Sequence, residues 1–540
     1  MRFEETAVAE AEGTILAHSL RLGSLNFKKG RRLDAEDIRA LQQARVETVI
    51  AARLEEEDVH EDAAAQRLAE ATAGTGTQTS AAFTGRCNIV AARRGLLVYD
   101  RARLDAFNLE DEAITLAALA PYEVVEPKQM LATVKIIPFA APKTALARCL
   151  EVAADPGRLL RVAAFQRKRV ALVQTSLPGQ KESLLDKTHE AIKQRLGALG
   201  IDSLKESRCA HDSKAVAQAV ARRVGEGADL VLVSGASAIV DRRDVVPSGI
   251  VQAGGEIEHF GMPVDPGNLM LMARVGEVPV LGLPGCARSP KLNGFDWVLQ
   301  RLVADVPVRR EDIMRMGAGG LLKESGARPL PRAEAVEDKS VPRAPRIAAI
   351  VLAAGRSSRM GERNKLLEEV EGSPLVLHAV RAAKASQADS LLVVTGHEHE
   401  AVERVLAPEK VRTVHNPDYA QGLSTSLHRG LAALPDDCDG AVVLLGDMPK
   451  VTAEVIDRLI AAFSPVEGRS ICLPMRQGRR GNPVLFARRY FAEVMEISGD
   501  LGARPLLANY PDQVAEVPMP DDAVLTDVDT PEQLDALRGG

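Results

Sequence analysis

The chain has 540 residues, of which 46% are hydrophobic, and at about 150 residues per domain it has room for three to four packed domains. A formal net charge of −6 argues against a general binder of nucleic acid or membrane surfaces, and an aromatic content of 3% disfavours a base-stacking platform. The six cysteines are scattered and form no Cys-x-x-Cys pair, so we expect neither a disulfide framework nor a metal cluster. The chain has no run of 18 apolar residues, so we expect no membrane span. Together with the acidic start, these features lead us to expect a cytoplasmic protein.

Residues 1–165 carry few chemical signals and are predicted as a mixed α/β region with a structural role. The expected elements are a helix capped by Asp34, a second helix over 55–71, and short strands over 96–99 and 132–137. Three phrases in this region, at 27–38, 60–62 and 131–138, resemble the front half of molybdopterin-binding proteins related to the molybdenum-inserting transferases.

Residues 166–316 show a regular alternation of strands and helices. Strands are expected over 170–174, 229–234 and 278–283, with helices over 187–199 and 213–224. This alternation predicts an α/β domain with a mainly parallel sheet and with ligands at the carboxyl ends of its strands.

Three glycine-containing loops follow those strands and resemble the loops that surround the pterin phosphate and dithiolene in the molybdopterin-binding fold. Their candidate binding residues are Ser234, Gly235, Ser237, Gly267, Pro284 and Gly285. The loop at 174–179 lacks the acidic residues that metal-inserting relatives carry, so the resemblance implies binding of molybdopterin more than chemistry on it. Glycine at a strand end is often only turn geometry, and Asp241 and Asp244 are either site acids or a solvated loop.

Residues 317–345 collect glycine, charge and four prolines, which is typical of a linker that is extended in places. The remaining residues, 346–540, again alternate strands and helices. Strands are expected over 347–352, 390–395, 411–414, 441–445 and 470–473.

The strongest signal of the chain lies at 347–367. An apolar run typical of a strand buried on both faces precedes a loop of small and basic residues. Small residues let backbone N–H groups approach a ligand, while Arg359 and Lys365 add positive charge. The segment therefore predicts a nucleoside triphosphate site, although it lacks the dinucleotide and P-loop fingerprints. The alternative is an ordinary strand–loop–helix turn with basic residues on a solvated surface.

Asp447 is a candidate metal ligand because of its position after an apolar run. Asp447 follows the apolar run 441–445, which carries its carboxylate to the edge of the sheet; if this strand and the strand at 347–352 are parallel neighbours, the carboxylate lies near the loop that begins at Ala353. Mg²⁺ prefers one or two carboxylates together with phosphate and water. Asp529 precedes Thr530 and Pro531, an expected helix start. The alternatives are that Asp447 caps a turn and that Asp529 only supports the helix.

The motif Leu352-Ala-Ala-Gly-x-Ser-x-Arg-Met-Gly, followed by Asn364-Lys365-Leu-Leu, resembles the signature of nucleotidyltransferases that activate molybdopterin, in particular the molybdenum cofactor cytidylyltransferase family. Guanylyltransferase relatives usually carry Leu-Ala-Gly-Gly where this chain has Ala354. The resemblance implies a Rossmann-like domain that joins the phosphate of molybdenum-bearing molybdopterin to the α-phosphorus of CTP and releases pyrophosphate.

Several residue roles follow from this resemblance. Arg359, Lys365 and Asp447 are the candidate catalytic residues, with Mg²⁺ held by Asp447 and Asp529. The candidate nucleotide-binding residues are Leu352, Ala353, Ala354, Gly355, Arg359, Lys365 and Gly446. Further candidate molybdopterin-binding residues in this domain are Ser424, Ser426 and Asn482.

Three alternatives stay open at this point. The domain could use GTP or a sugar phosphate with the same architecture, or the whole chain could be a non-catalytic carrier or chaperone of the cofactor. Residues 1–308 could also insert molybdate, which the missing acidic loop disfavours. We expect a molybdoenzyme or its chaperone as the acceptor of the product, and neither nucleic acid nor a membrane as a partner.

Overall fold

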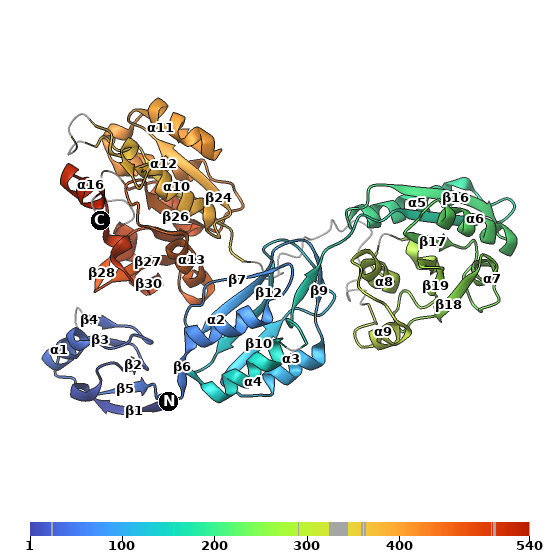
Figure 1. Cartoon of the computed structure of the whole chain (residues 1–540), viewed down its shortest axis with the longest axis horizontal. Helices are drawn as coiled ribbons and strands as arrows, with labels where there is room; N and C mark the ends of the chain where they lie inside the picture. Colours follow the sequence, from blue (N-terminus) through green and yellow to red (C-terminus); the bar gives the residue numbers. More distant parts are fainter. Residues whose placement is uncertain are drawn as a thin grey trace.

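The computed structural model of the chain describes residues 1–22, 25–154, 156–289, 291–322, 344–357, 360, 363–497, 499 and 504–538. Four domains follow one another along the chain (Figure 1). Figure 1 shows the central domain, which contains α2, α3 and α4, between the third domain on one side and the N-terminal and C-terminal domains on the other. Among the described helices, none combines the length and the hydropathy that crossing a bilayer requires.

The N-terminal domain is small and has a hydrophobic core of its own, around Leu16, Leu33 and Leu41. Its elements are β1 (Arg2–Ala7), β2 (Ile15–Leu16), β3 (Leu20–Leu22), β4 (Leu25–Phe27), α1 (Ala35–Gln43) and β5 (Thr48–Arg53). As predicted, Asp34 caps α1: its side chain accepts from the backbone N–H groups of Glu36 and Asp37, and Asp37 completes a capping box.

The central domain has a hydrophobic core separate from that of the N-terminal domain, so residues 1–165 do not share one core. Its elements are β6 (Asp58–His60), α2 (Glu61–Thr72), β7 (Thr77–Thr79), β8 (Arg86–Ala91), β9 (Gly95–Val98), α3 (Arg101–Asn108), β10 (Ile114–Ala118), β11 (Val124–Val125), β12 (Met130–Ile136), β13 (Ala140–Pro142), α4 (Lys143–Ala154) and β14 (Arg161–Ala163). The helix predicted over 55–71 begins at Glu61, because Asp58–His60 pair with β13 as a strand.

The third domain has a six-stranded sheet in the order β16-β15-β17-β20-β19-β18. Its elements are β15 (Val170–Ser176), α5 (Glu182–Gly197), β16 (Leu204–Ala210), α6 (Ser213–Gly225), β17 (Leu230–Ser234), α7 (Val245–Gln252), β18 (Gly255–Phe260), β19 (Leu271–Val275), β20 (Val278–Leu283), α8 (Gly294–Val303) and α9 (Arg310–Met314). The first four strands of that order pair in parallel, β19 is antiparallel to β20, and β18 is antiparallel to β19. The sheet is therefore mainly parallel, as predicted, while the polar edge strand β16 shows no apolar run that would predict it.

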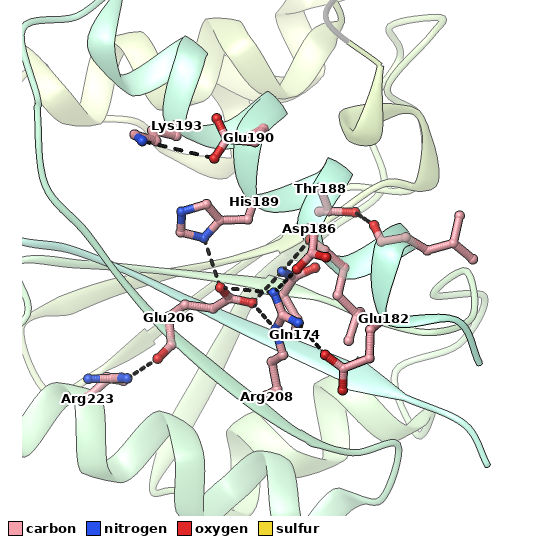
Figure 2. Close-up of polar contacts among 12 residues, drawn as sticks. Gln174, Glu182, Asp186, Thr188, His189, Glu190, Lys193, Glu206, Arg208 and Arg223 are labelled. Atoms are coloured by element: carbon pink, nitrogen blue, oxygen red, sulfur yellow. Dashed lines mark hydrogen bonds and ion pairs between the residues drawn. The ribbon is translucent and has the colours of Figure 1, made fainter. Parts of the chain in front are cut away.

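A polar cluster fixes α5 and the ends of β15 and β16 to one another (Figure 2). The Glu206 carboxylate accepts from Arg208 Nε at 2.5 Å and from Gln174 Nε2 at 2.8 Å, and it pairs with His189. Burial by itself would raise the pKa of Glu206, but these hydrogen bonds outweigh burial and lower it. The acidic partners of Arg208 on α5 are Glu182 and Asp186. Arg208 thus serves three carboxylates, one on β16 and two on α5.

The C-terminal domain is built on an eight-stranded sheet in the order β25-β24-β21-β26-β29-β27-β28, with β30 paired to β27. Its main elements are β21 (Ile347–Ala353), α10 (Leu375–Ala385), β24 (Ser390–Thr395), α11 (His399–Leu406), β25 (Arg412–His415), α12 (Leu423–Ala432), β26 (Gly440–Leu445), α13 (Ala453–Ala462), β27 (Ile471–Arg476), β28 (Arg479–Arg480), β29 (Val484–Ala487), α14 (Phe491–Val494), α15 (Arg504–Asn509), β30 (Val514–Pro518) and α16 (Pro531–Arg538). All seven residues of the central strand β21 are buried, which confirms the predicted strand with both faces covered.

Most of the predicted linker, residues 323–343, lies outside the described residues. The C-terminal domain nevertheless contacts the domains that precede the linker. Lys128 pairs with Asp389 at 2.7 Å and Arg86 with Glu467 at 3.2 Å. Lys28 of the N-terminal domain donates to the backbone carbonyl of Val514 in β30.

Candidate functional site

The predicted nucleotide loop begins where the two central strands of the C-terminal sheet end. β21 and β26 are parallel neighbours with Leu352 opposite Leu445, which meets the condition for Asp447 to lie near this loop, and the Gly446 N–H donates to the Leu352 carbonyl at 2.9 Å. A Cβ at Gly446 would lie 3.0 Å from that oxygen, so a side chain there would strain this contact. Ala353 and Ala354 are buried, whereas Gly355 is exposed with open space where a side chain would stand. The chain thus leaves the core at Gly355.

Lys365 links the two predicted metal ligands. Its Nζ atom lies 2.5 Å from Oδ2 of Asp447 and 2.8 Å from Oδ1 of Asp529. The Lys365 side chain is 12% exposed and that of Asp447 is 17% exposed, so this contact is largely shielded from water. The Val528 N–H also donates to the Asp447 carbonyl at 3.0 Å, which joins the two segments through their backbones.

The two carboxylates keep Lys365 charged. Burial by itself would lower the pKa of Lys365, but the charge and hydrogen bonds of Asp447 and Asp529 outweigh burial, and the pKa is raised. At neutral pH the side chain is therefore an ammonium group held between two carboxylates. Such a group is a suitable counter-charge for a triphosphate.

The donor set fits Mg²⁺. The Oδ1 atom of Asp447 is buried, and no hydrogen-bond partner for it occurs among the described residues. A buried carboxylate oxygen without a partner is costly unless a ligand or cation completes it. No group of three or more His, Cys, Asp or Glu side chains in the described part of the chain is arranged to hold a metal by protein ligands alone. Two carboxylates with phosphate oxygens and water complete the coordination that Mg²⁺ prefers.

Local sequence explains how Lys365 and Asp529 reach this place. The Asn364 side chain caps a short 3-10 helix, Lys365–Leu367, which starts the lysine side chain from a fixed turn. At the start of α16 the Gln533 N–H donates to Thr530 Oγ1, and Gln533 Oε1 accepts from the N–H groups of Asp529 and Thr530. The helix start is thus capped by Thr530 and Gln533, and the Asp529 carboxylate extends to Lys365 instead. Arg359 lies outside the described residues.

The acceptor residues predicted in this domain differ in accessibility. Ser424 and Ser426, at the start of α12, are only 2% and 3% exposed. Ser426 Oγ accepts from the Asn416 side chain at 3.0 Å, so it is engaged inside the domain. Asn482 is half-buried, and its N–H donates to the Val524 carbonyl. Ser426 therefore fits a structural role better than a ligand contact.

The six candidate residues of the third domain lie at the carboxyl edge of its sheet. Ser234 ends β17 opposite Leu283, the last residue of β20, and Pro284 and Gly285 follow directly. The loop that contains Gly267 joins β18 to β19 at this same edge, because Leu271 pairs with Gly282. A Cβ at Gly267 would lie 2.7 Å from the backbone nitrogen of Gly294, so Gly267 packs against the start of α8.

The candidate pterin residues form two groups that the fold does not bring together. Figure 1 shows the third domain and the C-terminal domain on opposite sides of the central domain. Ser234 and its neighbours therefore do not share a pocket with Ser424, Ser426 and Asn482 within one chain. Sequence cannot predict this separation, because it depends on how whole domains are arranged.

Three residues at the edge of the third domain were not singled out from the sequence. Thr175 and His211 are hydrogen-bonded to the Ser234–Ser237 loop, and Arg288 Nη2 donates to the Gly235 carbonyl at 2.8 Å. A polar residue between a strand end and a predicted helix start is the one signal that could have indicated His211. In the C-terminal domain, Gly396 packs against the nucleotide loop: a Cβ at this position would lie 2.6 Å from the Ala354 Cβ.

Family models match three parts of the chain. Residues 349–514 match the MobA-like NTP transferase domain, and residues 169–304 match a family described as a probable molybdopterin binding domain. Residues 5–53 match a domain of unknown function. The first two matches coincide with the C-terminal and third domains of the structure.

Individual proteins show the same likeness. The purine catabolism protein PucB of Bacillus subtilis (strain 168) is 31% identical over 205 residues, which cover 36% of this chain and 98% of the relative. The molybdenum cofactor cytidylyltransferase of Escherichia coli (strain K12) is 27% identical over 189 residues, which cover 35% of this chain and 93% of the relative. A solved nucleotidyl transferase from Methanothermobacter thermautotroptrophicus is 24% identical, with a TM-score of 0.33, and covers 36% of this chain and 96% of that one.

Proposed function

Because the chain belongs to the family of MobA-like NTP transferases, we propose that its C-terminal domain transfers CMP from CTP to the phosphate of molybdopterin. The coarser assignment, a nucleotidyltransferase joined to a molybdopterin-binding domain, follows from the family matches. The nucleotide and the acceptor are the proposal, and the cytidylyltransferase relative supports them.

In the proposed reaction, an oxygen of the molybdopterin phosphate attacks the α-phosphorus of CTP. A new P–O bond forms, the bond to the β-phosphate oxygen breaks, and pyrophosphate leaves with the electron pair. The attacking phosphate is already ionised near neutral pH, so no general base is needed. Positioning and neutralisation of charge carry such phosphoryl-type transfers.

The contact between Lys365 and the two carboxylates carries this proposal. Lys365 and Arg359 would bind the triphosphate and stabilise the leaving pyrophosphate. Asp447 and Asp529 would hold Mg²⁺, which when bound supplies further positive charge against the phosphate oxygens. The loop from Leu352 to Gly355 would meet the nucleotide through its backbone, since its exposed end at Gly355 is open.

The preference for CTP rests on the motif around Ala354. The Ala354 methyl is buried against Gly396 and does not project into open space. Any effect of Ala354 on the choice of base would therefore act through the position of the loop. A nucleotidyltransferase of the same fold that uses GTP or a sugar phosphate is the competing proposal. A carrier without activity would bind the cofactor and yield no product.

The third domain is proposed to bind molybdopterin at the carboxyl edge of its sheet, and a molybdoenzyme or its chaperone to receive the product. One experiment tests the activity directly. Purified full-length protein is incubated with Mg²⁺, molybdenum cofactor and equal concentrations of CTP and GTP, and the nucleotide attached to the pterin is identified by mass spectrometry. We expect the cytidine dinucleotide with release of pyrophosphate. A guanosine product would replace the nucleotide assignment, and no product at all would favour the carrier.

A further inference from the structure

A chain of hydrogen bonds connects three side chains at the carboxyl edge of the third domain. Thr175 Oγ1 lies 2.8 Å from His211 Nδ1, and His211 Nε2 lies 2.9 Å from Ser237 Oγ. Thr175 is buried near the end of β15, His211 follows β16, and Ser237 belongs to the loop after β17. In outline the three residues resemble a catalytic triad, in which a histidine accepts a proton from a serine nucleophile.

The hydrogen bonds of the Thr175 hydroxyl exclude a catalytic triad in which His211 accepts the Ser237 proton. Thr175 is 0% exposed, and its Oγ1 already accepts from the Ala236 N–H at 2.7 Å. A hydroxyl has one proton to donate, and His211 Nδ1 is the acceptor that the described residues offer it. If Nδ1 donated instead, the Thr175 proton would be buried without an acceptor, which folded proteins rarely tolerate. Nδ1 therefore accepts, and the ring carries its proton on Nε2.

The direction of the second hydrogen bond follows. Nε2–H donates to Ser237 Oγ, so His211 cannot take a proton from Ser237. The Ser237 hydroxyl keeps its own proton for another acceptor, and Ser237 is exposed at the edge of the sheet. Ser237 is therefore a hydrogen-bond donor toward solvent or a ligand, and not a nucleophile activated by His211.

The surroundings hold this geometry rigidly. Arg288 Nη2 donates to the Gly235 carbonyl, and a Cβ at Gly235 would lie 2.8 Å from the Ser237 carbonyl and 3.9 Å from the His211 ring. On the other side, the Gln174 side chain donates to the Leu185 carbonyl at 2.9 Å and fixes the strand end next to Thr175. Arg288 thus fastens the loop at Gly235, before Ser237, and Gln174 fastens the strand that carries Thr175.

We propose that His211 is a positioning residue of the molybdopterin site, which receives a hydrogen bond from Thr175 and aims the Ser237 hydroxyl proton at an acceptor oxygen of the bound pterin. The phosphate monoester offers the strongest such acceptors in that molecule, because hydrogen bonds to charged oxygens are the strong ones. This inference rests on the proposed pterin site for its ligand, but the direction of the hydrogen bonds is a property of the ligand-free chain.

The first test reads the tautomer without any ligand. Full-length protein labelled with ¹⁵N-histidine is examined by long-range ¹H–¹⁵N correlation, and the His211 signals are identified by their loss in His211→Gln. We expect a protonated Nε2 and an unprotonated Nδ1, retained in Thr175→Ser and lost in Thr175→Val. An unprotonated Nε2 in the wild-type protein would overturn the proposal. So would labelling of Ser237 by a fluorophosphonate, which reacts with activated serines.

The second test uses purified molybdopterin and equilibrium dialysis against the full chain. Ser237→Ala is expected to weaken binding about tenfold or more, as loss of a hydrogen bond to a charged group does. His211→Gln can still donate near the Nε2 position, whereas His211→Asn reaches only the Nδ1 position, so the Gln variant should bind more tightly than the Asn variant. Ser203→Ala, at the opposite edge of the sheet, is the matched control and should bind as the wild type does.

The outcomes separate this inference from the function proposed above. If the Ser237→Ala and His211→Asn variants bind molybdopterin as tightly as the wild type does, His211 is not a positioning residue. If the full chain binds one molybdopterin whose affinity Asn482→Ala lowers and Ser237→Ala does not, the pterin site of the third domain is wrong whatever the tautomer of His211. Melting temperatures of all variants show whether a loss of binding is a loss of fold.

Discussion

The Nζ atom of Lys365 lies 2.5 Å from Oδ2 of Asp447, although the two residues are 82 positions apart in the chain. In the ligand-free chain this ammonium group pairs with both carboxylates that we propose as Mg²⁺ ligands. In the proposed reaction Asp447 and Asp529 would hold the metal, and Lys365 would be free to turn to the triphosphate. We therefore expect substitutions at this contact to affect both the stability of the empty site and its activity.

Asp447→Asn should lower turnover by about two to three orders of magnitude, because the charge that develops on the transferred phosphate loses a main counter-charge. The fold should persist, since Asn keeps the shape of the side chain. Pyrophosphate release under saturating CTP and molybdenum cofactor measures the effect. Asp436→Asn is the matched control, because the Asp436 side chain is fully exposed and its ion pair with Arg488 lies at the surface. Turnover like that of the wild type in the Asp447 variant would remove Asp447 from the mechanism.

Lys365→Met should destabilise the C-terminal domain at neutral pH by about 1–3 kcal/mol, because it leaves two carboxylates close together without their cation. The pKa of Lys365 is raised above its unfolded value of 10.5. Its stabilising contribution is therefore complete below pH 10.5 and is lost as the pH rises through the folded pKa. Urea unfolding from pH 7 to pH 11 should show the difference between wild type and variant shrinking at the top of this range. A constant difference would contradict the assignment, and exposed Lys205→Met serves as control.

Gly396→Ala should both destabilise the domain and weaken CTP binding. The added methyl would lie 2.6 Å from the Ala354 Cβ and would push the nucleotide loop outward. Overpacking of this kind costs about 1–3 kcal/mol. The double variant Ala354→Gly/Gly396→Ala exchanges the two methyl groups and should recover part of both losses. The single variant Ala354→Gly completes the cycle, and a double-variant loss equal to the sum of the two single losses would show that the two residues do not act on one another.

A fragment from residue 343 to the end should fold and transfer the nucleotide alone, because its core is formed mainly by residues 347–524 of this domain. It should melt at a lower temperature than the same domain in the full chain, since it loses the contacts of Lys128 with Asp389 and of Phe83 with Arg469. At limiting molybdopterin it should also be less efficient, because a second binding domain on the chain raises the local concentration of acceptor, up to about the millimolar range for a short flexible linker. A comparison of initial rates at limiting and saturating molybdopterin checks this, and equal efficiency at both would argue against the role proposed for the third domain.

Sequence by itself determined the features that depend on short stretches of chain. The apolar run 347–352 predicted the strand β21, and the run 441–445 predicted a strand that carries Asp447 to the edge of the sheet. The alternation between 168 and 308 predicted the mainly parallel sheet, and Asp34 predicted the start of α1. These features are readable because burial on two faces, capping and turn chemistry depend on neighbours within a few residues.

Only the tertiary structure decided which distant residues meet. Asp529 reaches Lys365 across 164 positions, and His211 meets Ser237 and Thr175 through the order in which their strands pair. The tertiary structure also divided the first 165 residues into two cores and placed the two groups of candidate pterin residues in separate domains. No local pattern encodes these contacts, because they result from the packing of whole sheets and domains. The burial of apolar surface and the order of the strands determine which side chains meet.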